Sequence, residues 1–177
     1  MNFQVSQNIA AVEAPPIAEA MSWVRQGERN RLFLNLCQAV PSYAPAPELQ
    51  AEFARLAQTD GIGGYTNIYG IETLRAAHAA HMARDYAGHI AASHVAITTG
   101  CNQAFAAAIM SVAAAGDCVV MPTPWYFNHQ MWLKMLGIGI QSIPAFSGGL
   151  NYPDVEAAER AITEKTRAIV LCTPNNP

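Results

Sequence analysis

The sequence predicts an α/β fold in which helices cover both faces of a mostly parallel sheet, giving three layers. The first observation is the order of the expected elements, which runs β-α-β-α-β-α-β from residue 94 onward. The second is that the expected strands are short, apolar and rich in β-branched residues, as buried strands are. The third is the composition, 51% apolar and 13% charged, which indicates a globular chain.

Each expected element is bounded by glycine, proline or a change of periodicity. Residues 1–14 are expected to form a loose arm, and the glycine-rich stretch 61–70 a loop. Helices are expected at 15–26, 48–58, 71–86, 103–115, 126–136 and 153–163. Strands are expected at 31–36, 95–99, 117–121, 138–143 and 167–172.

The turn Gly100-Cys101-Asn102 separates the strand expected at 95–99 from the apolar helix that follows it. Such a turn lies at a helix N-terminus, where backbone N–H groups have no intrahelical acceptor and the helix dipole is positive. It therefore favours an anion, and phosphate above all. The alternative interpretation is an ordinary connection between a strand and a helix, with no ligand.

Charge and cysteine content argue against several classes of function. The net charge is −3 and no run of lysine or arginine occurs, so a nucleic-acid-binding surface is not expected. None of the four cysteines lies in a Cys-x-x-Cys pair, which argues against zinc and disulfides and for a cytoplasmic protein with reduced thiols. The chain starts without a signal-peptide pattern, and its most apolar run, 104–115, is shorter than the ~18 residues of a membrane span.

Further patterns carry little functional signal by themselves. Residues 61–64 are rich in glycine but follow a helix and lack the spacing of a dinucleotide-binding motif. His78 and His81 share a helix face without a third ligand nearby, so no metal site is expected. Tyr126 follows Pro124 at a strand end, where its ring either belongs to the core or covers a planar ligand.

A series of motifs, in this order and spacing, resembles the class I/II aminotransferases, which are pyridoxal phosphate enzymes of fold type I. The resemblance covers roughly residues 33–177 and implies the large domain of that fold type, incomplete in this chain. The motifs are Tyr65 followed by Gly70-Ile71-Glu72-Thr73-Leu74-Arg75, then Thr99-Gly100-Cys101-Asn102-Gln103-Ala104, Gly116-Asp117, Pro122-Thr123-Pro124-Trp125-Tyr126 and Thr173-Pro174-Asn175-Asn176-Pro177.

The resemblance implies that the cofactor is pyridoxal 5′-phosphate and assigns residues to it. Backbone N–H groups of Gly100, Cys101 and Asn102 would bind its phosphate, although the family often has glycine where Cys101 stands. Tyr126 matches the aromatic residue that stacks on the pyridine ring. Asn176 matches the asparagine that hydrogen-bonds the ring hydroxyl.

Two more positions concern the partner subunit and the substrate. Tyr65 matches the tyrosine that reaches the phosphate of the neighbouring subunit, which implies a homodimer with shared active sites. Ala39 lies where the family often has a glycine near the substrate carboxylate. The resemblance implies that the Schiff-base lysine lies after the Asn-Pro motif, and so after residue 177; Lys134 and Lys165 do not lie in its sequence context. The aspartate that pairs with the pyridine nitrogen and the arginine that binds the substrate carboxylate are also expected there.

The resemblance also implies a domain organisation. Residues 1–46 would form an N-terminal arm and part of the small domain, and residues 47–177 the first part of the large cofactor-binding domain. Because the chain stops directly after an expected buried strand, we expect it to be the N-terminal part of a longer protein.

The activity implied by the resemblance is transfer of an amino group between an amino acid and a 2-oxo acid. Because a fold does not fix the reaction, an elimination enzyme such as a C–S lyase is the alternative within enzymes. An inactive fragment is a further alternative. A regulator that only senses the cofactor would need a basic helix-turn-helix domain upstream, and residues 1–30 are too short to hold one.

Overall fold

A computed structural model of the chain describes residues 3–27, 34, 40–146 and 153–175. The chain divides into two compact units, one formed by Met1–Pro16 with Thr98–Pro177 and the other by Ile17–Ile97. Within the described residues, no helix is both long enough and apolar enough to cross a membrane. The domain boundary expected after residue 46 stays a prediction.

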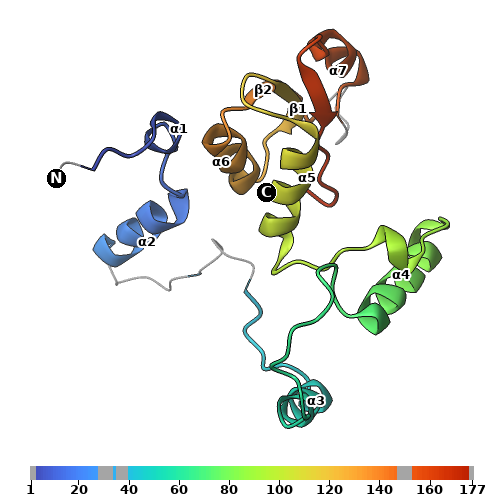
Figure 1. Ribbon diagram of the computed structural model, residues 1–177. Helices are drawn as coiled ribbons and strands as arrows, with labels where there is room; N and C mark the ends of the chain where they lie inside the picture. Colours follow the sequence, from blue (N-terminus) through green and yellow to red (C-terminus); the bar gives the residue numbers. More distant parts are fainter. Residues whose placement is uncertain (1–2, 28–33, 35–39, 147–152, 176–177) are drawn as a thin grey trace. The chain divides into compact units, whose positions relative to one another are not determined.

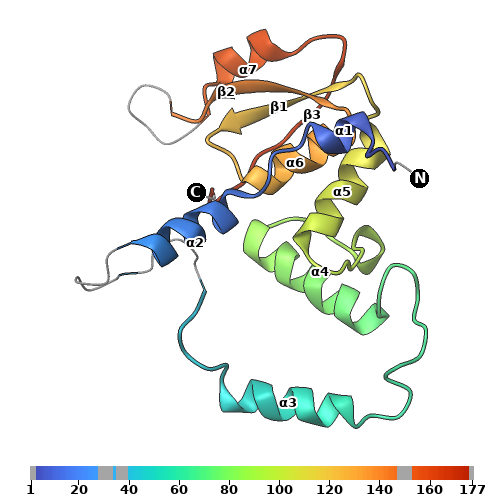
Figure 2. The same cartoon turned by 90° about the vertical axis from the view of Figure 1, so that its left-hand side faces the viewer.

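The first unit contains a parallel sheet with the strand order β2-β1-β3; Figure 1 labels β1 and β2, and Figure 2 labels all three strands. The central strand β1 (Cys118–Thr123) pairs along its whole length with β2 (Gly139–Pro144), starting with Cys118 beside Gly139. On its other edge β1 pairs with β3 (Thr166–Ile169), with an irregularity between Cys118 and Val119. The expected parallel sheet is therefore confirmed for these three strands.

Helices lie on both faces of this sheet, as expected. α6 (Phe127–Met135) connects β1 to β2, and α7 (Val155–Ala161) connects β2 to β3. The chain crosses the sheet in opposite directions in these two connections, and crossovers between parallel strands are right-handed, so the two helices belong on opposite faces. Figure 2 shows α7 on one side of the strands, and α6 with α5 (Cys101–Val112) on the other.

The core of this unit lies between β1 and the pair α5 and α6. Val119 and Met121, which share a face of β1, are at most 1% exposed and cluster with Ile109 of α5 and Leu133 of α6. Burying a side chain of this kind contributes about 1.5–3 kcal/mol. These contacts fix the positions of both helices, and the candidate site lies at their N-terminal ends.

The N-terminal arm is less loose than expected. It contains a short helix, α1 (Gln7–Ala10), which packs against α6. The hydroxyl of Ser6 accepts a hydrogen bond from the N–H of Ile9, and the carboxylate of Glu13 lies 3.5 Å from Nζ of Lys134. A single helical turn has no apolar periodicity of its own, so the sequence pattern could not indicate it.

The second unit consists of helices and loops in its described part. Its helices are α2 (Pro16–Gln26), α3 (Pro47–Ala57), α4 (Glu72–Tyr86) and the 3₁₀ turn η1 (Ala92–His94). The expected helices are confirmed to within about two residues at most ends, a usual margin for helix boundaries. The strand expected at 31–36 falls almost entirely outside the described residues.

The strand expected at 95–99 is wrong, because this segment is extended at Val95 but pairs with no strand in the described part of the chain. Its backbone groups have other partners. The carbonyl of Val95 accepts a hydrogen bond from Nε of Arg75 at 2.8 Å, and the N–H of Ile97 donates to the carbonyl of Tyr69 at 3.0 Å. The β-branched pattern marks an extended segment, but a strand also needs a neighbouring strand.

Candidate functional site

The candidate site begins at the turn where α5 starts. Gly100 has a φ of +93° and directly precedes Cys101, the first residue of the helix. Any other residue would be strained at this φ, although no atom lies within 4 Å of where its Cβ would stand. Gln103 fixes the turn from within the helix, since its Oε1 accepts hydrogen bonds from the N–H and the hydroxyl of Thr99, at 2.7 and 2.5 Å.

This turn leaves polar groups of α5 without partners in the part of the chain that the structure describes. Among the described residues, none accepts a hydrogen bond from the N–H groups of Cys101 or Asn102, as is usual for the first turn of a helix. Oδ1 of Asn102 is buried and has no hydrogen-bond partner in the same part of the chain. Buried polar atoms are paired in most proteins, so this turn has unused capacity for a polar ligand.

A pocket of about 630 Å³ opens at the carboxyl ends of β1 and β3. Its walls come from the end of β1 with the start of α6, from the segment after β2, and from the segment after β3. Trp125, Tyr126, Phe146 and Leu171 give it a largely apolar and aromatic lining. In parallel sheets of this kind, ligands bind outside the carboxyl ends of the strands.

Aromatic contacts support the ring of Tyr126 at this pocket. His129 meets it edge to face with ring centroids 5.4 Å apart, and His129 in turn stacks on Phe105 of α5 at 4.1 Å. Nδ2 of Asn128 donates a hydrogen bond to the hydroxyl of Tyr126 at 2.8 Å. The orientation of the Tyr126 ring is therefore set by α5 as well as by its own helix.

Burial lowers the pKa of His129 below its ordinary value of 6.5, because the charged imidazolium loses water when it is packed against Phe105. His129 is thus neutral at physiological pH. The aromatic stack between α5 and α6 carries no charge, which suits an apolar pocket.

The structure places the predicted site residues in different surroundings. Tyr126 lines the pocket, whereas Gly100, Cys101 and Asn102 form the turn at the start of α5 in the same unit. Tyr65 belongs to the second unit, and its side chain is fully exposed. Asn176 and Ala39 lie outside the described residues. The roles assigned to all of these residues stay predictions.

Sequence reasoning missed the residues that support the predicted ones. His129 carries no signal as an isolated histidine, and only its spacing of three from Tyr126 on a helix places the two side chains together. Asn175 donates a hydrogen bond from Nδ2 to the carbonyl of Pro124 at 3.0 Å, which joins the segments that follow β1 and β3. No sequence pattern indicates a contact across 51 positions.

Comparison with known protein families decides the relationship of this chain. The model of the family described as aminotransferase class I and II matches residues 32–177. The chain belongs to this family. The expected resemblance is therefore confirmed, over almost the same residues.

The curated relatives of this aminotransferase-family chain are longer than the chain. An aspartate aminotransferase of Thermotoga maritima is 28% identical over 160 residues, which cover 90% of this chain and 41% of that protein. An aromatic aminotransferase of Arabidopsis thaliana is 28% identical over 147 residues, which cover 81% of this chain and 37% of that protein. The chain spans about two fifths of the length of these relatives.

Solved aminotransferase structures share the fold. A variant of the aspartate aminotransferase of Thermus thermophilus superimposes with a TM-score of 0.84 at 26% identity, over 99% of this chain and 46% of that one. An alanine aminotransferase from Pyrococcus furiosus superimposes with a TM-score of 0.88 over 98% of this chain and 45% of that one. At 21% identity the second likeness shows the fold alone. The expected fold type I architecture is thus confirmed.

The stacking of His129 on Phe105 leads to a prediction about protonation. We expect the NMR titration of His129 to have a midpoint below 6.5, and Phe105→Ala to move it back toward that value by admitting water. Because the unfolded chain binds this proton more tightly, the free energy of unfolding should fall as the pH drops below 6.5. Phe53→Ala, which truncates an exposed phenylalanine of α3, is the control. An unshifted midpoint in Phe105→Ala would contradict the assignment.

Proposed function

We propose that the protein acts as a pyridoxal 5′-phosphate-dependent aminotransferase that moves an amino group between an amino acid and a 2-oxo acid. Membership of the aminotransferase class I and II family supports this, as do relatives named aspartate and aromatic aminotransferases. The observation that carries the proposal is the start of α5 directly after Gly100. This start leaves the N–H groups of the first helical turn open.

The residues at this turn suit a phosphate group. The N–H groups of Cys101 and Asn102 have no acceptor among the described residues, and the positive end of the α5 dipole favours the negative charge. The unpaired Oδ1 of Asn102 is an acceptor, but a half-turn of the amide exchanges it for Nδ2, which donates. Asn102 therefore adds a side-chain donor to the backbone donors once an anion is bound.

The pocket suits an aromatic ring. Tyr126 presents a flat face whose position is fixed by Asn128 and His129, and stacked aromatic pairs contribute beyond the area they bury. We assign the cofactor ring to this face, the ring hydroxyl to Asn176 and the neighbourhood of the substrate carboxylate to Ala39. When bound, pyridoxal phosphate supplies an electron-withdrawing ring that stabilises negative charge at the α-carbon of the substrate.

Under this proposal, the described residues bind and orient the cofactor. The proton transfer belongs to the Schiff-base lysine, which is expected after residue 177. We also propose a homodimer in which Tyr65 contacts the phosphate held by the other subunit; the complete exposure of its side chain supports this role. A cytoplasmic location is proposed from the cysteines, of which Cys101, Cys118 and Cys172 are free thiols in the described residues.

Replacing Tyr126 tests the stacking role. Tyr126→Ala should weaken binding of pyridoxal 5′-phosphate to the intact protein by about 0.5–1.5 kcal/mol beyond the lost buried area, because the stacking face is gone. Tyr126→Phe should retain most of the affinity, since it keeps the ring. Tyr86→Ala, a change at an exposed tyrosine of α4, is the matched control. Equilibrium dialysis measures the affinity, and the same value for Tyr126→Ala and wild type would remove the assignment.

Replacing Tyr65 tests the shared site. Tyr65→Phe deletes one hydroxyl and should weaken cofactor binding by at most the ~1.5–3 kcal/mol of a hydrogen bond to a charged group. Tyr43→Phe makes the same change at another exposed tyrosine and should have no effect. Sedimentation of the wild-type protein during turnover should show a dimer. A fully active monomer would overturn the proposal of a shared site.

A further inference from the structure

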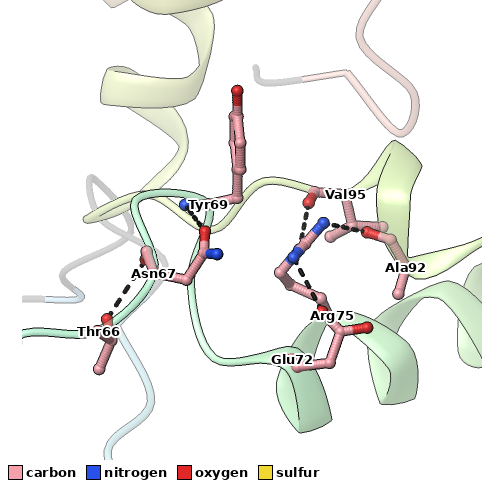
Figure 3. A network of polar contacts seen from close by, with 7 residues as sticks. All are labelled: Thr66, Asn67, Tyr69, Glu72, Arg75, Ala92 and Val95. Carbon is pink, nitrogen blue, oxygen red and sulfur yellow. Dashed lines mark hydrogen bonds and ion pairs between the residues drawn. The ribbon is translucent and has the colours of Figure 1, made fainter.

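The guanidinium of Arg75 is the polar centre of the second unit. The residue is only 8% exposed, although it carries a permanent charge. Nε donates to the carbonyl of Val95 and Nη2 to the carbonyl of Ala92, each at 2.8 Å, and Nη1 lies 2.9 Å from the carboxylate of Glu72 (Figure 3). A buried charge is tolerated only when its donors are paired, and these contacts involve all three nitrogens of the guanidinium.

Arg75 also contacts the loop that follows Tyr65. Its guanidinium carbon lies 5.7 Å from the centre of the Tyr69 ring, within the range of a cation–π contact. The loop has internal order of its own, because the N–H of Tyr69 donates to Oδ1 of Asn67 at 2.9 Å. The N–H of Gly70 donates to the carbonyl of Asn67 at 2.8 Å.

The same loop lies directly against the extended segment that precedes Gly100. The carbonyl of Tyr69 accepts a hydrogen bond from the N–H of Ile97 at 3.0 Å. Gly70 has a φ of +99°, and a Cβ at this position would stand 2.8 Å from Cβ of Ile97, closer than side chains tolerate. The glycine is therefore required twice, by its backbone conformation and by this close approach.

Two segments that the proposed function assigns to phosphate binding thus meet at one side chain: the segment before Gly100 serves the site of its own subunit, and the segment after Tyr65 serves the site of the partner subunit. Val95 lies five positions before Gly100, and Tyr69 lies four positions after Tyr65. We propose that Arg75 is a positioning residue for phosphate binding, which fixes the peptide that enters the Gly100 turn and the peptide that leaves Tyr65. This inference rests on the proposed function, since both segments are assigned there to the cofactor phosphate.

The contacts of Arg75 require the geometry of an arginine side chain. The planar guanidinium reaches two carbonyls and the ring of Tyr69 at once, whereas a lysine ammonium is a point charge that cannot reproduce this geometry. The side chain of Glu72 is 72% exposed, so its ion pair with Arg75 contributes little to stability by itself. The contacts to Val95, Ala92 and Tyr69 are therefore the ones that set the positions of the two segments.

The test compares pyridoxal 5′-phosphate with pyridoxal, which lacks the phosphate, as ligands of the intact protein. In Arg75→Lys we expect the affinity for pyridoxal 5′-phosphate to fall about tenfold, the equivalent of one lost hydrogen bond to a charged group. The affinity for pyridoxal should not change. Arg84→Lys makes the same change at an exposed arginine of α4 and should alter neither affinity. A purely structural role would weaken both ligands equally in Arg75→Lys.

A second variant leaves the buried charge in place. Asn67→Ala removes the acceptor of the Tyr69 N–H and should give a smaller loss that is again confined to pyridoxal 5′-phosphate. In the Arg75→Lys background, Tyr65→Phe should lower the affinity for pyridoxal 5′-phosphate by a smaller factor than in the wild type, because a displaced Tyr65 hydroxyl contributes less to binding.

The outcomes separate this inference from the function on which it rests. If the wild type binds both ligands equally, the proposed phosphate site fails and the role of Arg75 fails with it. If the wild type prefers pyridoxal 5′-phosphate but Arg75→Lys loses affinity for both ligands equally, or for neither, only the role of Arg75 is overturned. A loss confined to the phosphate-bearing ligand supports the role.

Discussion

The backbone of Gly100 is the constraint on which the candidate site depends. With its φ of +93°, Gly100 joins the segment 95–99 directly to α5, which begins at Cys101. Ala106 and Ile109 are each 4% exposed and anchor the helix in the core. Because the helix cannot shift along its axis without breaking that packing, the open N–H groups of its first turn occupy a fixed place. A ligand at this turn meets preset donors and not a flexible loop.

The pocket at Tyr126 depends on the same packing. α5 and α6 are joined in the core through Ile109 and Leu133, and again by the stack of Phe105 on His129. The second contact lies near the N-terminal ends of α5 and α6, next to the ring of Tyr126. Under the proposed function, the phosphate and the ring of one cofactor would bind to two elements that a common core holds together.

The sequence was sufficient to predict most of the elements and the location of the turn. Glycine, proline and β-branched runs are local signals, and they placed α5, α6 and the strands of the sheet correctly to within about two or three residues at most ends. The segment 95–99 shows where local signals stop. Its partners are the side chain of Arg75, twenty positions before Val95, and the carbonyl of Tyr69, and neither leaves a mark in the pattern of the segment itself.

In the candidate site, too, local sequence signals indicate single residues but not the long-range contacts between them. Gly100 and Tyr126 follow local rules, because a turn before a helix and an aromatic residue at a strand end can be recognised in sequence. The stack of His129 on Phe105 and the bond from Asn175 to Pro124 join residues 24 and 51 positions apart, and they exist only in the folded chain. These contacts decide how the locally predicted residues are oriented. Sequence alone could therefore predict the site residues, but not the residues that hold them in place.

The most direct measurement is the response of the backbone amides of α5 to a phosphate-bearing ligand, followed by NMR and by hydrogen exchange. The account predicts that the amides of Gly100, Cys101 and Asn102 shift and become protected when pyridoxal 5′-phosphate is added, and that pyridoxal leaves them unchanged. Equal responses to both ligands, or protection that bypasses these amides and appears elsewhere, would contradict the claim that the start of α5 is the phosphate site.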